Sequence, residues 1–140
     1  MTTSLVLDSY LKIKRVVAAL RAQEMKNLEF GANQISVLYR LSLSDATMGE
    51  LVEHALTDKA SMTRTITSLV KAGFVRRKSD SEDRRTVRIE LTTKGKEKAI
   101  IAKKVRINIQ KRLEESLSSK DRQAFASLVD KLTDALNEHL

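Results

Sequence analysis

The feature that most constrains this chain is a pair of strand-like segments set between stretches that are patterned for helices. Val87-Arg88-Ile89-Glu90-Leu91 alternates apolar and charged residues strictly, as a half-buried strand does, and the segment 75–78 precedes it. The charged connection over residues 79–86 is too long for a tight two-residue turn. We therefore expect one β-hairpin with a long charged tip in a chain that is otherwise helical.

Apolar residues recur at helical spacing on both sides of this hairpin, and the absence of proline means that no helix is interrupted from within. Capping residues and glycines predict where the helices begin and end. The expected order is a long helix ending near residues 27–31, a second ending near 42–45, a short third from Thr47, a fourth from Asp58 to Gly73, the hairpin, and two more helices beginning near residues 92 and 118.

This order predicts a mainly α fold with a small β-hairpin wing, that is, a winged helix-turn-helix core flanked by long dimerisation helices. With 140 residues and no long linker, we expect a single interleaved domain. Residues 31–95 would form the winged helix-turn-helix lobe, and residues 1–30 and 96–140 the helical dimerisation region. The flanking helices carry more apolar surface than one small core needs, which favours a homodimer. The alternative is a monomer in which these helices fold back on the core.

The amino-acid composition indicates which classes of partner this chain can have. The chain has 26 Lys and Arg against 18 Asp and Glu, a net charge of +8 that attracts polyanions such as nucleic acid. The absence of cysteine excludes disulfides, thiolate metal sites and thiol-based redox sensing by this chain. We find neither a secretory signal nor an apolar run of the roughly 20 residues that span a bilayer. We expect a cytoplasmic, nucleoid-associated protein with no membrane partner.

Catalysis has little support in the sequence. His54 and His139 are the only histidines, and neither has a partner at the spacing of a metal site or a catalytic triad. The four glycines stand singly and form no phosphate-cradling loop. Glu82 and Asp83 lie in a loop of charges and lack the geometry of an acid/base couple. We therefore expect no enzymatic activity, no catalytic residue, no cofactor and no metal.

The fourth helix carries the strongest functional signal. At about 100° per residue, Met62, Ile66 and Leu69 share one face. The opposite face is small, hydroxylated and basic, and no acidic residue occurs between Lys59 and Ala72. Such a face can enter a major groove closely, and arginine is the side chain that best reads guanine there. An ordinary solvated face would carry more Glu and Lys, so we favour groove recognition.

The hairpin tip carries arginines beside acidic residues. Arginines on a thin protrusion can reach into a narrow, A·T-rich minor groove. Carboxylates repel phosphates, so we interpret Asp83 as the partner of Arg85 that fixes the loop. Taken without the preceding helices, the tip is more typical of a solvated charged turn.

At this point the chain resembles the MarR family of transcriptional regulators. The wing, Asp80-Ser81-Glu82-Asp83-Arg84-Arg85 through Leu91-Thr92-Thr93-Lys94-Gly95, is similar to the pattern of that family, without a gap. Met62-Thr63-Arg64, followed by Leu69-Val70-Lys71-Ala72-Gly73-Phe74-Val75, resembles its recognition helix and the exit into the wing. The resemblance implies a homodimeric regulator, expected to be a repressor, whose paired recognition helices read a pseudo-palindrome in double-stranded DNA.

Carried over by position, the resemblance implies a set of DNA contacts. Arg85 would reach the minor groove with Asp83 orienting it. The resemblance also implies contacts in the major groove from Ser61, Thr63, Arg64 and Thr67, and a contact with the DNA backbone from Arg84. Independently of the resemblance, further backbone contacts are expected on the fourth helix from Lys59, Ser68 and Lys71.

Two departures and one open question accompany the resemblance. Ser81 stands where the family often has proline, which should loosen the wing, and the absence of cysteine rules out the oxidation-sensing branch. Family members often bind aromatic or phenolic effectors between the dimer helices and the DNA-binding lobe, so a small-molecule effector is a candidate partner. Side chains that could line such a cleft are Tyr10, Phe30, Tyr39 and Arg40, although core packing explains the apolar ones equally well.

The ligand-binding residues therefore stay unassigned, as do the operator and the regulated genes. A second function from another class also remains open: a winged-helix module for protein–protein assembly, without sequence-specific DNA binding. Such a module needs no basic recognition face, so the charge on the helix that contains Arg64 and on the wing tip separates the two.

Overall fold

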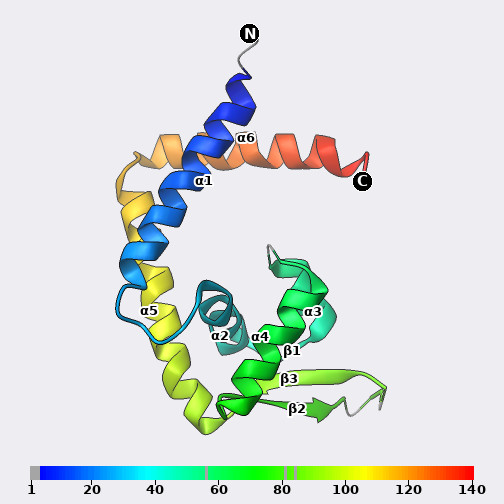
Figure 1. Cartoon of the computed structure of the whole chain (residues 1–140). Helices are drawn as coiled ribbons and strands as arrows, with labels where there is room; N and C mark the ends of the chain where they lie inside the picture. The colour runs from blue at the N-terminus through cyan, green and yellow to red at the C-terminus, as the bar shows by residue number, and fades with distance from the viewer. Residues whose placement is uncertain (1–3, 56, 81, 84) are drawn as a thin grey trace.

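The computed structural model describes residues 4–55, 57–80, 82–83 and 85–140, and its elements follow the predicted order (Figure 1). The helices are α1 (Leu5–Glu24), α2 (Ala32–Leu43), α3 (Met48–His54), α4 (Lys59–Lys71), α5 (Thr93–Glu115) and α6 (Ser119–Asn137). The strands are β1 (Ala46–Thr47), β2 (Val75–Ser79) and β3 (Val87–Leu91). The fold is a mainly helical winged helix-turn-helix, which confirms the predicted fold class.

The sheet has three antiparallel strands in the order β1-β3-β2. β2 and β3 form the wing hairpin, with a register that runs from Val75 opposite Leu91 to Ser79 opposite Val87. β1 adds a short edge in which Ala46 pairs with Ile89. The sequence did not predict β1, because two residues are too few to show alternation.

Side chains at the helix starts satisfy backbone amides that have no partner within the helix. Asp58, Thr92 and Ser118 each accept a hydrogen bond from the amide three residues on, as their sequences predict. The hydroxyl of Thr47 does the same for α3. The carboxylate of Glu50, three residues after Thr47, lies against the guanidinium groups of Arg40 and Arg88.

The core is built around α2, which packs between α5 and the helix-turn-helix. Leu38 of α2 is fully buried together with Ile66 and Leu69 of α4, and Ala102 of α5 belongs to the same cluster. This single core joins the winged lobe to the N-terminal half of α5, so the lobe is packed directly against that helix.

The exit from α4 into the wing passes very close to the start of α5. Gly73 takes a φ of +83°, the left-handed conformation predicted for the end of α4. The Phe74 carbonyl then accepts a hydrogen bond from the Thr92 amide at 3.0 Å. It also lies directly over Gly95, where a Cβ would fall 1.8 Å from the Phe74 oxygen. Only glycine fits at this crossing.

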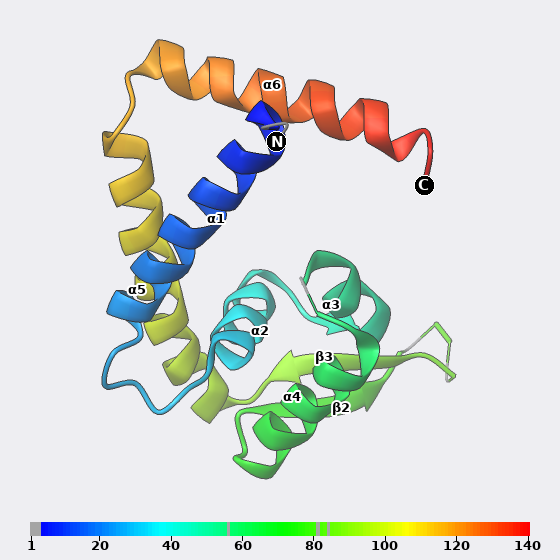
Figure 2. The same ribbon diagram turned by 45° about the horizontal axis from the view of Figure 1, so that its top comes forward.

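Two long helices leave the lobe and carry exposed apolar faces. α1 runs along α5, held in part by hydrogen bonds from Asn108 to Glu24 and from Arg112 to Gln23. α6 turns at the end of α5 and runs across the top of the view, apart from the lobe (Figure 2), and none of its residues, all of which are described, is buried. Large apolar side chains exposed on α6 are Phe125, Leu128, Val129, Leu132 and Leu136. Within one chain these side chains lie in water.

Candidate nucleic-acid interface

The faces of α4 are arranged as its sequence predicts. Met62, Ile66 and Leu69 are buried against the core. Thr65 is buried beside them, and its hydroxyl donates a hydrogen bond to the Ser61 carbonyl at 3.0 Å. Of the predicted major-groove residues, Ser61 is half-buried, whereas Thr63, Arg64 and Thr67 are exposed on the opposite face. α4 therefore presents hydroxyl groups and a guanidinium to solvent.

The N-terminal turn of α4 holds this guanidinium in place. Asp58 accepts a hydrogen bond from the Ser61 amide at 2.7 Å, and this bond is the main reason that the pKa of Asp58 lies below its usual value. The Ser61 hydroxyl in turn accepts a hydrogen bond from Arg64 Nη2 at 2.9 Å. Arg64 is thus oriented by its own helix before any partner arrives, which lowers the entropy cost of a contact.

The predicted backbone contacts on α4 differ in what they can offer. Lys59 and Lys71 are exposed at the two ends of the helix. The Ser68 hydroxyl donates to the Thr65 carbonyl at 2.7 Å and accepts from Gln34 Nε2 at 3.0 Å. Ser68 therefore joins α4 to α2, and its hydroxyl proton is already used in this conformation. The sequence did not predict a role for Gln34, whose hydrogen bond helps to fix the orientation of the Ser68 hydroxyl.

The described part of the wing tip contains the predicted ion pair. Arg85 Nε lies 3.7 Å from Asp83 Oδ1, and the same oxygen accepts a hydrogen bond from the Arg85 amide at 3.0 Å. Thr86 donates to the other carboxylate oxygen at 3.2 Å. The Arg85 side chain remains 95% exposed. Ser81 and Arg84 lie outside the described residues.

A network of ion pairs, which the sequence did not predict, ties the wing to the helix-turn-helix. Arg88 of β3 contacts Asp45 at 2.9 Å, Asp80 at 3.6 Å and Glu50 at 4.0 Å. Lys78 of β2 lies 3.3 Å from the same Asp45. These residues come from the segment before β1, from α3, from both wing strands and, in the case of Asp80, from the connection that follows β2. The network therefore fixes the root of the wing relative to α3, and the Arg88 hydrogen bond lowers the pKa of Asp45.

This depressed pKa predicts how stability responds to acid. Asp45 contributes fully above its ordinary pKa near 3.8, and its contribution is lost as the pH falls through the lower pKa of the folded state. Asp45→Asn should therefore lower the free energy of unfolding at pH 7, and the gap to wild type should close as the pH falls below about 4. Urea titrations from pH 7 to pH 3 measure it. Asp134→Asn on exposed α6 is the control; a gap independent of pH for Asp45→Asn would contradict the network.

A cavity of about 790 Å³ opens between α1, α2 and α5. Tyr39 lines it, and the Arg106 guanidinium lies 5.1 Å from the centre of that ring. The other three side chains suggested for such a cleft do not line it. Phe30 is buried against Phe74, Arg40 contacts Glu50 and Ser44, and Tyr10 is exposed near the start of α1. These three side chains have a suitable chemistry for a ligand site, but the packing of the helices places them outside the cavity.

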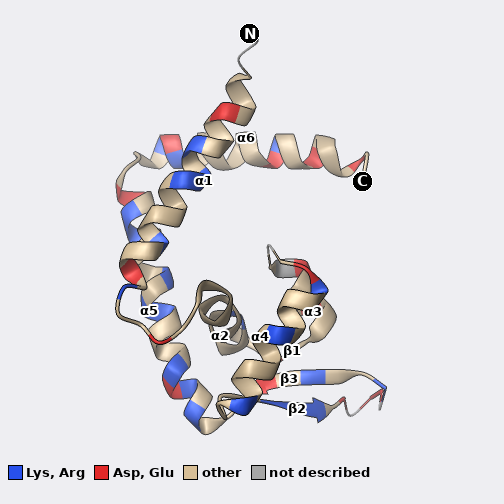
Figure 3. Ribbon diagram, in the orientation of Figure 1, with Lys and Arg blue, Asp and Glu red and all other residues tan. Residues whose placement is uncertain are grey.

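Figure 3 shows the charge that accompanies these elements: Lys and Arg recur along α4, β2 and α5. Among the described residues, no group of three or more His, Cys, Asp or Glu is arranged to hold a metal ion. None of the helices described is long and apolar enough to cross a membrane. The geometry that stands out is a helix-turn-helix with an exposed polar and basic second helix beside a charged hairpin, which defines a winged helix-turn-helix protein.

Comparison with known proteins shows which family the winged lobe is similar to. Residues 31–87 match the model of the MarR family. A search of the curated proteins found no significant match.

Solved structures give the same architecture over nearly the whole chain. AbsC, a MarR family transcriptional regulator from Streptomyces coelicolor, is 20% identical with a TM-score of 0.83, covering 98% of this chain and 99% of its own. A MarR transcriptional regulator from Methanosarcina mazei Go1 is 23% identical with a TM-score of 0.76, covering 99% and 100%. BpsR from Bordetella bronchiseptica is 19% identical with a TM-score of 0.78, covering 96% of each chain. At these identities the likeness establishes the fold.

Proposed function

We propose that this protein is a transcriptional regulator that binds a pseudo-palindromic site in double-stranded DNA as a homodimer and represses transcription in the cytoplasm, at the nucleoid. Residues 31–95 would form the DNA-binding lobe, and residues 1–30 and 96–140 the dimerisation region. The observation that carries the proposal is the exposed face of α4, where Arg64 is held by Ser61 beside Thr63 and Thr67. The guanidinium has the fork geometry that reads guanine O6 and N7.

The protein–protein assembly module is the weaker candidate. A docking helix for a protein partner is usually recognised by apolar anchors at helical spacing. The large apolar side chains of α4 are instead turned into the core, and its free face is polar and basic. The adjacent wing tip also exposes Arg85. Both features suit phosphates and base edges better than an apolar protein surface.

Binding to fluorescent duplexes of random sequence, measured across a salt series and followed by selection of the tightest binders, tests this function. We expect affinity to fall steeply with salt, because neutralised phosphates release counterions, and an inverted repeat to be enriched. Binding that depends on salt without enrichment would leave only a non-specific nucleic-acid protein. An absence of binding at low salt would favour the assembly module.

The homodimer is supported by the uncovered apolar face of α6. A two-fold interface would remove these side chains from water, and a fully buried leucine contributes about 1.5–3 kcal/mol. Leu128→Glu combined with Leu132→Glu should therefore raise the dimer dissociation constant by roughly a hundredfold or more. Ser127→Glu, on the opposite face of α6, is the matched control. Sedimentation equilibrium measures both, and an unchanged dissociation constant in the double variant would place the interface elsewhere.

We further propose that a small aromatic effector controls DNA binding from the cavity between α1, α2 and α5. The cavity is supported as a site by its size and by the Tyr39 ring with Arg106 stacked on it. The structure of the similar BpsR is described as a mechanism for regulation of its DNA binding by 6-hydroxynicotinic acid. An effector of this kind must bind the DNA-incompetent state more tightly. Aromatic acids that release labelled DNA from wild type but not from Tyr39→Ala would support the site.

A further inference from the structure

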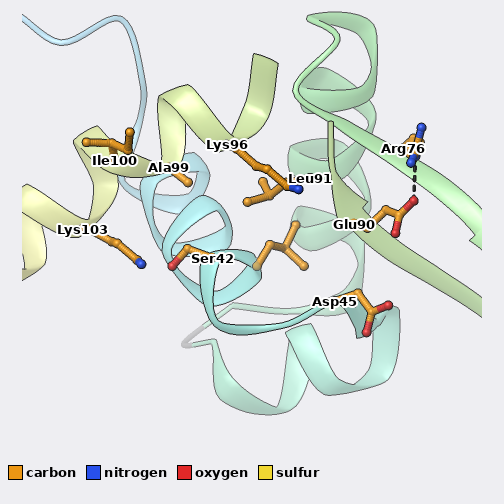
Figure 4. A pocket seen from close by; sticks show the side chains of 10 residues that line it. Ser42, Asp45, Arg76, Glu90, Leu91, Lys96, Ala99, Ile100 and Lys103 are labelled. Carbon is orange, nitrogen blue, oxygen red and sulfur yellow. Dashed lines mark hydrogen bonds and ion pairs between the residues drawn. The ribbon is translucent and has the colours of Figure 1, made fainter. Parts of the chain in front are cut away.

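A second cavity, of about 390 Å³, opens where the end of α2, the first half of α5 and the root of the wing meet. We call it the wing-root groove (Figure 4). It shares no lining residue with the cavity that contains Tyr39. Its size falls within the roughly 300–1,000 Å³ that small-molecule sites commonly occupy. The proposed effector of the other cavity therefore does not account for it.

One side of the groove is apolar and partly wet. Leu91 of β3 and Ala99 and Ile100 of α5 contribute its hydrocarbon surface. Ile100 is 67% exposed, which is high for a large aliphatic side chain beside a cavity. A hydrocarbon group that covered this surface would gain about 25 cal/mol for each Å² removed from water.

Two ammonium groups stand beside this apolar surface. Lys96 and Lys103 both line the groove and both are exposed (Figure 4). Among the residues that the structure describes, no carboxylate lies within 4.0 Å of either ammonium group. Their charge is therefore available to a ligand.

The two acidic residues that line the groove are already neutralised. Glu90 pairs with Arg76 at 2.6 Å and with Lys78 at 2.9 Å. Asp45 is held by Arg88 and by the same Lys78. The charge left over in the groove is therefore positive, and an anion would meet no unpaired carboxylate there.

We propose that the wing-root groove binds a small amphipathic anion, a carboxylate with a short hydrocarbon body. The carboxylate lies between Lys96 and Lys103, and the body covers Leu91, Ala99 and Ile100. A ligand of the opposite charge would face two ammonium groups without compensation, and a purely apolar one would leave both unused. The site does not depend on DNA binding, so it stands or falls independently of the proposed function.

Nuclear magnetic resonance of the full ¹⁵N-labelled chain tests this site with hexanoate as the probe. We expect hexanoate to move the amide signals of Ser42, Leu91 and Ala99 with saturation in the millimolar range. Lys96→Gln combined with Lys103→Gln should weaken this binding at least tenfold and leave the remaining spectrum in place. Lys104→Gln, an exposed lysine that does not line the groove, is the matched control and should bind as wild type does.

Hexylamine, which has the same body and the opposite charge, separates charge recognition from simple apolar binding. Equal shifts with hexylamine would overturn the proposal, and so would hexanoate shifts confined to the cavity around Ser36, Tyr39 and Ile109. An absence of shifts up to saturating hexanoate would overturn it as well. Selective hexanoate shifts at the groove that the double variant loses would establish it.

Discussion

Gly95→Ala should cost this protein a large part of its stability. The new Cβ would lie 1.8 Å from the Phe74 carbonyl oxygen and 2.8 Å from the carbonyl carbon, both of which are backbone atoms that no rotamer change can move. The same carbonyl accepts the Thr92 amide, and the Phe74 amide donates to the Leu69 carbonyl. A shift of Phe74 would therefore disturb the end of α4 and the root of the wing together. We expect a loss of about 3 kcal/mol or more, at the upper end for overpacked sites.

Urea unfolding followed by circular dichroism measures this loss. Gly31→Ala is the matched control, because its φ is −80° and a Cβ there would meet nothing within 4 Å. Its cost should stay near 1 kcal/mol, the usual difference between glycine and alanine at a helix N-cap. A Gly95→Ala variant as stable as Gly31→Ala would contradict the close crossing of α5 and Phe74.

Arg64→Ala should have the largest effect on sequence discrimination. Its guanidinium is exposed on α4 and held by Ser61, so it can meet a base edge with little loss of side-chain entropy. If it reads guanine, the variant should bind the selected site more weakly by about 1–3 kcal/mol, roughly 5- to 150-fold, and bind random DNA almost as wild type does. Competition titrations with the selected and a scrambled duplex measure the two losses separately.

Two other variants distinguish base reading by Arg64 from contacts with phosphates and with the minor groove. Lys59→Ala, at the start of α4, should weaken all sequences alike and flatten the salt dependence by about one counterion. Arg85→Ala should act mainly where the DNA under the wing is rich in A·T pairs. Equal losses on every sequence for Arg64→Ala would make Arg64 a phosphate contact, and no loss would remove it from the interface.

Most of the fold could be predicted from patterns among residues that are close together in the sequence. The caps at Asp58, Thr92 and Ser118 act over three residues, and the alternation of residues 87–91 acts within one strand. Such patterns are written in neighbouring residues and can be read without knowing the tertiary structure. The same holds for the faces of α4 and for the Asp83–Arg85 pair of the proposed interface.

The contacts that could not be predicted from the sequence join residues that are far apart in the chain. Arg88 and Asp45 are 43 residues apart, and Gln34 and Ser68 are 34 apart, so their contacts exist only after α2, α4 and the wing have packed. The suggested cleft residues failed for the same reason. Arg40 has a suitable side chain, but Glu50 and Ser44 hold it away from the cavity. Side-chain type indicates what a residue can do, whereas packing decides which partner it meets.

Because the apolar face of α6 is uncovered in a single chain, we expect the stability of this protein to depend on its concentration. Most of the stability of a helix in a protein comes from packing of its apolar face, and the 19-residue α6 has nothing to cover that face within one chain. In the proposed dimer, the ordering of α6 and subunit association become one equilibrium, so the melting temperature should rise with protein concentration. Newly made or scarce chains would then offer proteases a frayed end, and abundant chains would not. The cell could thereby clear unassembled subunits by the same surface that completes the assembled ones.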